Sequence, residues 1–430
     1  MKSYQHYVTG SMTFGVSAGM ISLLARWALP NIILFSPVFL MKYGLIAGIV
    51  FSLATTLGLF FFGMLVNNIR NTYPDLETLG DLFKSRLTSD GYWIMSFSTL
   101  FLGLNSIFIK IVGASIFFNL LFDIPFIFTL FFFLLYCFIV AGLGGMYWIH
   151  KFEGLSLFFI FSALIIIPIY FYIQDGIYPI YVGIRLFHPY LLFINNQEVM
   201  LFLFTALLIG FGQVLIDQAT WQRLYSIERQ KVRTTFYLTS IIWTTVPLAI
   251  SGMVLISIFN QKLNENSSVI FQLLTKIDPI ILSVAFLLFC FFIIVAAIKA
   301  ELHATTVHFV KHIRKPLKNS FSDRDMYRSS YLFSAISLLG LLIITYFFTF
   351  DYIKLLFFLG SLYASMIPVM LIIILGKRKL SRLIPYTVFI GWGAGSLIFW
   401  GTNPVSIIWI IFLISVVFVL LSMFFTPKEK

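Results

Sequence analysis

The sequence predicts an all-α, polytopic membrane protein with about twelve membrane-spanning helices. Of the 430 residues, 60% are hydrophobic and only 11% are charged, and the mean hydropathy is +0.97. That balance lies far outside the range of a soluble globular domain. A helix needs about 20 mostly apolar residues to cross a bilayer, and such windows recur from near the N-terminus to Phe425. We therefore expect a single transmembrane domain over residues 1–430.

Prolines, glycines and charged residues divide the chain into apolar segments of membrane-spanning length. These segments predict helices near residues 10–36, 43–66, 92–121, 125–146, 154–174, 198–222, 233–259, 278–312, 329–350, 352–376, 384–402 and 404–425. Two connections are longer than the rest, from Gln174 to Glu198 and from Asn260 to Asp278. Each is either a plain connector or a short interfacial helix or lid.

The basic residues predict the orientation of the chain. The formal net charge of +12 does not indicate nucleic-acid binding, because the basic residues lie in short loops between spans and not on one face. If both termini are cytoplasmic, most basic residues fall in inside loops, as the positive-inside rule requires. The outside loops then keep only Lys42, Arg185, Lys262, Lys276 and Lys354. We expect a multi-pass protein of the plasma membrane with both termini in the cytoplasm.

The two cysteines, Cys137 and Cys290, both lie inside apolar runs. A thiol in such a position usually behaves as a small hydrophobic side chain, so we expect neither a disulfide nor a metal site. The main acidic cluster outside the spans is Asp75, Glu77 and Asp81. The stretch from Asp75 to Thr78 resembles a helix cap, and it favours a loop helix over a catalytic centre.

Three motifs occur in order along the chain. The first comprises Ser17-Ala18-Gly19, Leu29-Pro30, Tyr43-Gly44 and the loop from Tyr73 to Arg86. The second begins with Gly144-Gly145 and continues through Tyr147-Trp148-Ile149-His150 to Glu153-Gly154. The third, and the most specific, is Asp217-Gln218-Ala219-Thr220-Trp221-Gln222-Arg223. Together they resemble signatures of the sodium:solute symporter family, although Ile149-His150 stands where that family has Thr-Asp, and Glu153 where it has Gln.

This resemblance implies a LeuT-like core of two inverted five-helix repeats, at about residues 9–175 and 198–376, followed by accessory helices at about 384–425. It also implies broken first and sixth helices around a solute site at the midplane. The implied function is secondary active symport of a small polar solute by alternating access, coupled to Na⁺ or H⁺. The implied partners are that solute and the lipid bilayer, with no nucleic acid, no cofactor beyond the coupling ion and no enzymatic activity.

Several small or polar residues are candidates for the solute site. In helix six, Gly210 and Gly212 precede Gln213, and two glycines beside a polar residue predict local unwinding. The alternative is that these glycines allow close helix packing. By resemblance, Ser17, Gly19 and Ser22 of helix one join the same site. Asn105 of helix three is added as a polar residue within a span.

Basic residues also occur within the predicted first and third spans. Arg26 in helix one and Lys110 in helix three each carry a cost of roughly 2.5–3.5 kcal/mol on insertion unless they face a partner or a cavity. Both are therefore candidates for function. For Arg26, extension of the side chain to the outer interface is the alternative, because Pro30-Asn31 follow closely.

Helix eight departs from the family pattern. By resemblance, a Ser-Thr pair there completes a sodium site with carbonyl groups of helix one, but this chain has Ala296, Lys299, Ala300 and Glu301 in that region. We expect these residues to form the ion-coupling site, where the Lys299 ammonium group could substitute electrostatically for a bound cation. Glu301 points away from the face shared by Lys299 and His303. The alternative for this end of the helix is a solvated amphipathic segment.

The sequence is also compatible with other functions. An ion-independent or proton-coupled amino-acid transporter, with Lys299 in place of sodium, is the first alternative. A membrane-embedded enzyme or a flippase is more remote. The sequence does not choose the solute, because this fold serves many.

Overall fold

The computed structural model describes residues 3–28, 30–121, 126–192, 197–258, 277, 279–318, 321–348, 350–376, 380–399 and 403–424. These residues form a bundle of helices, with one isolated β-bridge between Phe14 and Ile227. Within the described ranges, nine helices are long and apolar enough to cross a membrane, and shorter apolar helices lie at 16–27, 127–143 and 384–398. The shorter ones fall in the first, fourth and eleventh expected spans. The predicted all-α polytopic class is therefore confirmed.

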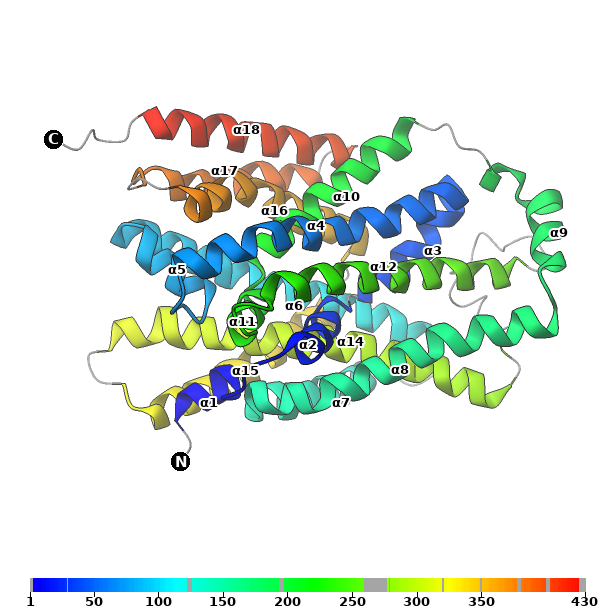
Figure 1. Ribbon diagram of the computed structural model, residues 1–430, viewed down its shortest axis with the longest axis horizontal. Helices are drawn as coiled ribbons and strands as arrows, with labels where there is room; N and C mark the ends of the chain where they lie inside the picture. The colour runs from blue at the N-terminus through cyan, green and yellow to red at the C-terminus, as the bar shows by residue number, and fades with distance from the viewer. Residues whose placement is uncertain are drawn as a thin grey trace.

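The helices follow the order of the expected spans (Figure 1). The α-helices are α1 (Tyr4–Thr9), α2 (Val16–Trp27), α3 (Pro30–Tyr43), α4 (Leu45–Thr72), α5 (Leu79–Arg86), α6 (Ser89–Leu121), α7 (Phe126–Cys137), α8 (Gly145–Gln174), α9 (Tyr178–Phe187), α10 (Gln197–Ile216), α11 (Gln218–Ser226), α12 (Val232–Ser257), α14 (Ile280–His308), α15 (Asp323–Phe347), α16 (Tyr352–Leu375), α17 (Val388–Gly395) and α18 (Pro404–Phe424). Two π-helical segments, η1 (Phe138–Leu143) and η3 (Phe309–Arg314), extend α7 and α14. Short 3₁₀ turns are η2 (Pro189–Leu192), η4 (Lys315–Leu317), η5 (Ile384–Thr387) and η6 (Ser396–Phe399).

The first and sixth spans are both interrupted. The first consists of α2 and α3, and Pro30 begins α3, where a residue without an amide hydrogen leaves no donor unpaired. The sixth consists of α10 and α11, separated by Asp217 in an extended conformation with φ −69° and ψ 103°. Asp217 is the N-cap of α11.

The break in the sixth span is not where the glycines predicted it. Gly210 and Gly212 lie inside the continuous helix α10. A Cβ atom on Gly58 of α4 would come within 2.7 Å of the Gly210 carbonyl carbon, and one on Gly212 would come within 2.6 Å of the Tyr363 carbonyl oxygen. The glycines therefore allow α10 to pack closely on α4 and α16, and the prediction of unwinding at this point was wrong.

The junction between the fourth and fifth spans lies at the Gly144-Gly145 motif. Gly145 has φ +67°, and a Cβ atom there would come within 2.6 Å of the Tyr7 ring, so this turn requires glycine. Helix α8 begins directly at Gly145 and not near residue 154, because the stretch between them is helical. The fifth span is therefore longer than predicted.

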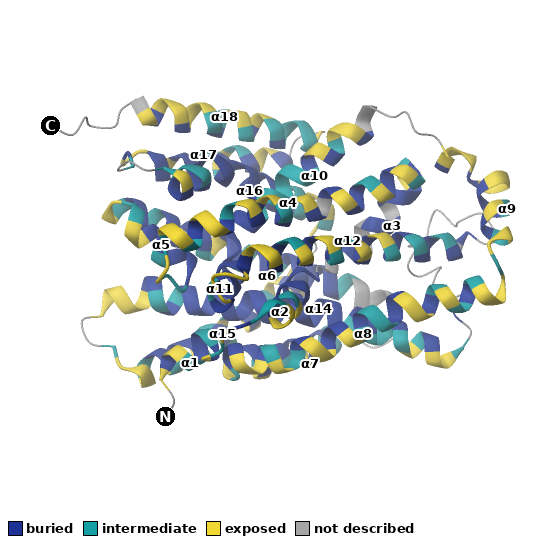
Figure 2. Cartoon of the chain, viewed as in Figure 1, coloured by how far each residue is buried: buried dark blue, intermediate teal, exposed yellow. Residues whose placement is uncertain are grey.

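The second half of helix α14 is buried in the bundle. Every residue from 292 to 308 is buried. Figure 2 shows α6, α11 and α14 mostly buried, while α9 and α18 expose much of their surface. The Nε2 atoms of His303 and His308 lie 2.9 Å and 3.0 Å from the carbonyl oxygens of Tyr7 and Ser96. The alternative of a solvated amphipathic segment at this end of helix eight is therefore wrong.

The loop helix α5 is capped by Thr78 and Asp81, which form a capping box. The N-cap is therefore Thr78, three residues after Asp75, where the expected cap sequence began. Burial acts to raise the pKa of the Asp81 carboxyl group, but His312, Lys311 and the hydrogen bonds of Thr78 outweigh it and hold that pKa below its usual value.

At the other end of the bundle, the connection from Gln174 to Glu198 contains the short helix α9, as one of its two readings predicted (Figure 1). The second long connection lies outside the described residues except for Ile277. Helices α1, α5 and α11 lie toward the opposite end from α9.

The close contact of α10 with α16 gives a stability prediction. Gly212→Ala should lower the thermal unfolding midpoint in detergent, because overpacking a tight contact costs about 1–3 kcal/mol. Gly340→Ala in α15 is the matched control, since no atom lies within 4 Å of the added Cβ. Alanine there should leave the midpoint unchanged or raise it, because it is the better helix former by up to about 1 kcal/mol. Equal midpoints for the two variants would contradict this packing.

Candidate functional site

Four charged side chains meet inside the bundle. Arg26, Lys110, Asp217 and Glu301 come from the end of α2, from α6, from the break in the sixth span and from α14. Their exposed fractions are 1%, 6%, 5% and 3%. We call these four residues the charge quartet. Two cations and two carboxylates in one buried site balance one another, which a low-dielectric interior requires.

Local structure positions the two residues at the helix breaks. Arg26 lies in the last turn of α2, where the helix dipole favours a cation. Asp217 precedes the first turn of α11, where the dipole favours an anion, and its carboxylate accepts a 2.7 Å hydrogen bond from the Thr220 amide. The two helix ends thus present opposite charges to each other.

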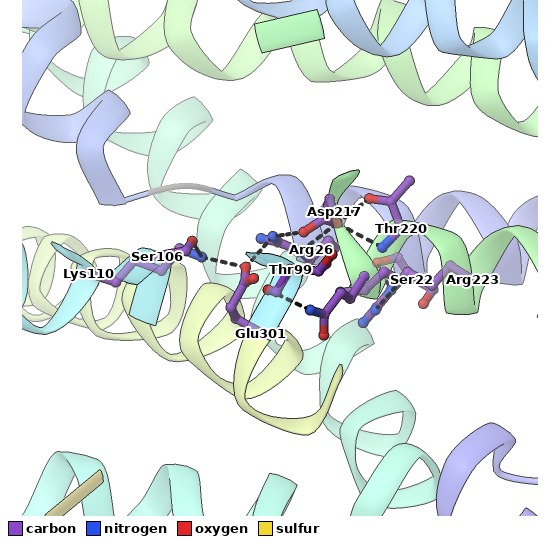
Figure 3. A network of polar contacts seen from close by, with 11 residues as sticks. Ser22, Arg26, Thr99, Ser106, Lys110, Asp217, Thr220, Arg223 and Glu301 are labelled. Carbon is purple, nitrogen blue, oxygen red and sulfur yellow. Dashed lines mark hydrogen bonds and ion pairs between the residues drawn. The ribbon is translucent and has the colours of Figure 1, made fainter. Parts of the chain in front are cut away.

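Arg26 connects three helices. Its Nε atom donates to Asp217 Oδ2 at 3.1 Å, and its Nη2 atom contacts both Asp217 Oδ1 and Glu301 Oε2 (Figure 3). Its Nη1 atom has no hydrogen-bond partner in the described part of the chain. The guanidinium group therefore joins the broken first helix to the broken sixth helix and to α14. The expected alternative for Arg26, extension to the outer interface, is wrong.

Lys110 completes the charge quartet from α6. Its ammonium group donates to Glu301 Oε2 at 2.8 Å and to Ser106 Oγ, one turn earlier, at 3.0 Å. Glu301 thus accepts hydrogen bonds from two cations on two different helices. The expectation that Lys110 has a partner inside the bundle matches this geometry.

The residues after Asp217 hold α11 against its neighbours. Gln218 donates to the Thr99 carbonyl oxygen at 2.9 Å, while Gln222 is buried beside it. Arg223 donates from Nε to the Ser22 carbonyl oxygen at 3.0 Å and from Nη2 to Glu153 Oε1 at 2.6 Å. The motif that carried the family resemblance therefore ties the sixth span to the first, third and fifth.

Glu153 also pairs with His150 on α8. We call His150, Glu153 and Arg223, together with the Ser22 carbonyl, the Arg223 cluster. Next to it, the Phe14 amide donates to the Ser226 carbonyl oxygen at 2.8 Å, and the Glu228 amide donates to the Phe14 carbonyl oxygen at 3.0 Å. This end of both broken helices is therefore closed by side-chain and backbone bonds together.

Lys299 lies on the other side of α14 from Glu301. Its side chain is fully buried, and its Nζ atom has no hydrogen-bond partner in the described residues. The titratable groups that interact electrostatically with it are Glu153, Cys137 and Arg223. Of the other predicted ion-coupling residues, Ala300 packs with Ala219 of α11 and Ala296 is buried. The structure thus separates Lys299 from Glu301.

A cavity of about 60 Å³ lies beside the charge quartet, between α6, α10 and α16. Its polar lining consists of Ser106, Lys110, Gln213, Tyr352 and Tyr363. Gln213, a predicted solute contact, therefore faces this space. Lys110 is the one residue shared by the cavity and the charge quartet.

Other predicted solute contacts lie away from this cavity. Ser17 is exposed on α2. Gly19 packs against Thr235 and Ile227, where a Cβ atom would come within 2.9 Å and 3.0 Å of side-chain carbons. Asn105 is half-buried on α6 but does not line the cavity. Gly210 and Gly212 serve the packing of α10, and Ser22 contributes its carbonyl group to the Arg223 cluster.

Sequence reasoning named Asp217 only as part of a motif and missed its ion pair with Arg26. The signal was present, since Asp217 is an acidic residue within an apolar span, where a charged side chain usually faces a partner. Ser106, Tyr352 and Tyr363 were also missed. Hydroxyl-bearing residues are too common in membrane helices to single out these three.

Comparison with known proteins identifies the fold. No protein-family model matches the chain, and no curated protein sequence matches it. A substrate-bound, outward-open Na⁺-coupled sialic acid symporter superposes with a TM-score of 0.80 at 13% identity, over 100% of this chain and 94% of that one. Mhp1, a nucleobase-cation-symport-1 family transporter in a closed conformation with bromovinylhydantoin bound, gives a TM-score of 0.60 at 11% identity, over 97% of this chain and 93% of that one. The chain has the LeuT-type fold that the resemblance implied.

The buried ion pair of Asp217 gives a second prediction. Asp217→Asn should destabilise the protein by about 3–5 kcal/mol, because it leaves Arg26 buried with only one carboxylate. Asp90→Asn is the matched control, since it breaks the exposed ion pair of Asp90 with Arg382. That variant should have the same thermal unfolding midpoint as the unmodified protein, within experimental error. The same small shift for both variants would show that the charge quartet does not stabilise the fold.

Proposed function

We propose that this protein is a secondary active transporter that moves a small polar solute by alternating access. The observation that carries the proposal is the Arg26–Asp217 ion pair, which joins two broken helices at a buried point of a LeuT-type fold. Broken helices that meet inside a bundle present free backbone groups to a solute. The three sequence motifs support a divergent relationship to the sodium:solute symporter family, with residues 9–175 and 198–376 as inverted repeats.

Alternating access needs a path that is open on one side of the solute and closed on the other. Along the sixth span, Gln213 precedes Asp217 and lines the cavity, whereas Arg223 follows Asp217 and belongs to the closed Arg223 cluster. In the orientation that the basic loops favour, the cavity lies toward the outside and the Arg223 cluster toward the cytoplasm. This arrangement supports a state that is closed on the cytoplasmic side of the plasma membrane.

The donor groups on α14 do not fit a sodium site shared with the first helix. The hydroxyl pair on this helix is Thr305 and Thr306, but Thr305 packs against Gly103 of α6, and Thr306 lies 3.1 Å from Ser334 Oγ of α15. Glu301, which does face α2, is already paired with Arg26 and Lys110. Because a guanidinium group joins α2 to α14 where a coupling cation would act, we propose proton coupling without sodium.

Glu301 and Asp217 are the carboxylates available to carry the coupling proton, because both lie at the centre of the charge quartet. Lys299 is a second candidate, since its buried ammonium group lacks a hydrogen-bond partner in the described residues. The two candidates predict different results for substitutions at Glu301 and Lys299. If Glu301 carries the proton, Glu301→Gln abolishes proton-driven uptake, whereas Lys299→Gln leaves its driving force unchanged.

Transport is tested with purified protein in liposomes. Solutes that raise the thermal unfolding midpoint are offered under an inward proton gradient, an inward sodium gradient, or neither. We expect uptake that follows the proton gradient, stops with a protonophore and is indifferent to replacement of sodium by potassium. Arg26→Met should lack uptake. No flux of any solute under either gradient would contradict transport, and a strict sodium requirement would contradict proton coupling.

The closed Arg223 cluster gives a prediction about access. A cysteine at Ser22 should react slowly with a membrane-impermeant thiol reagent added from the cytoplasmic side, because Ser22 is buried beneath Arg223. Adding Arg223→Gln should speed the reaction, since it removes the bonds to Ser22 and Glu153. The control is Lys231→Gln, which removes only the exposed ion pair with Glu228. Equal labelling rates in these two backgrounds would contradict a gate at Arg223.

A further inference from the structure

The cavity beside the charge quartet has a distinctive electrostatic character. Among the described residues that line it, Lys110 is the only charged one. The remaining polar groups are two tyrosines, Ser106 and Gln213, and the rest of the lining is apolar. A solute in this space therefore meets one ammonium group, several neutral hydrogen-bonding groups and an apolar wall.

The ammonium group of Lys110 has one N–H donor more than its two hydrogen bonds use. It carries three N–H groups, and two of them are directed to Ser106 Oγ at 3.0 Å and to Glu301 Oε2 at 2.8 Å. Because Lys110 also borders the cavity, the third is available to a solute. A carboxylate is the group that forms the strongest hydrogen bond with an ammonium donor. A cationic group would be repelled by the same donor.

We propose that the transported solute is a small organic anion whose carboxylate binds to Lys110. This inference rests on the proposed transport function and names the class of solute for the same site. The cavity of about 60 Å³ has room for a carboxylate and a few further atoms. The apolar and hydroxyl groups of α10 and α16 then contact the remainder of the solute.

Charge balance requires that a proton binds together with the solute carboxylate. The charge quartet is neutral when all four groups are ionised, so a bound carboxylate would leave one uncompensated negative charge in a low-dielectric site. Glu301 competes with the solute for Lys110, and the charged or titratable groups that face it are Arg26, Lys110, Asp217 and Tyr363. Protonation of Glu301 frees Lys110 for the solute carboxylate and leaves Arg26 paired with Asp217. One proton therefore enters with each monoanion, and the step is electroneutral.

The test is binding to the purified full-length protein in detergent, which does not require transport. Acetate, lactate and pyruvate are compared with the uncharged acetamide, lactamide and pyruvamide by thermal stabilisation and calorimetry. We expect stabilisation by at least one carboxylate and by none of the matched uncharged compounds. Binding should take up protons from a weakly buffered solution, in proportion to the carboxylate bound. This proton measurement uses the unmodified protein and remains informative if variants fail to fold.

Variants locate the binding group. Lys110→Met should weaken carboxylate binding by roughly 30-fold or more, and Lys110→Arg should restore part of it. The control is Lys354→Met, which removes an exposed lysine from the start of α16 and should bind normally. Stabilisation only by the uncharged compounds, or carboxylate binding unaffected by Lys110→Met, would overturn the inference. If uncharged solutes bind and are taken up in liposomes, the transport proposal survives while this inference fails.

Discussion

The ion pair between Arg26 and Asp217 holds the two broken helices together inside the bundle. Each residue ends or begins a helix within a membrane span, where unpaired backbone groups are costly. The guanidinium group at the end of α2 and the carboxylate at the start of α11 complement the two helix dipoles as well as each other. Glu301 and Lys110 extend this pair to α14 and α6, so that four elements meet at one neutral site.

The same contact divides the protein into a side with a cavity and a side that is closed. Lys110 belongs to both the charge quartet and the cavity, so a solute that binds there changes the charge balance of the whole site. On the other side, the Arg223 cluster fixes α11 against α2 and α8. A change of charge at the centre can thus alter how the two broken helices are held. This link between charge and helix position is the physical basis that we propose for coupling.

Hydropathy predicted some continuous spans closely, as for 404–425 against the observed Pro404–Phe424. It did not place the break in the sixth span, because tertiary packing decides whether glycines unwind a helix. Gly212 is needed where α10 touches Tyr363, which only the folded structure reveals. Lys110 was recognised from the cost of a buried charge, but the contact of Arg26 with Asp217 joins residues 191 positions apart. Helix periodicity did place Glu301 off the face shared by Lys299 and His303. The hydrogen bonds agree, because Glu301 bonds to Arg26 of α2 whereas His303 bonds to Tyr7 of α1.

In the mechanism that we propose, the Arg26 guanidinium group, and not a sodium ion, joins the broken first helix to α14. The most direct measurement is an experimental density map of the protein in lipid nanodiscs, prepared with sodium and separately with potassium. We expect the same map under both conditions, with Arg26 between the carboxylates of Asp217 and Glu301. A sodium-dependent ion between α2 and α14, with Arg26 turned away from Glu301, would contradict it.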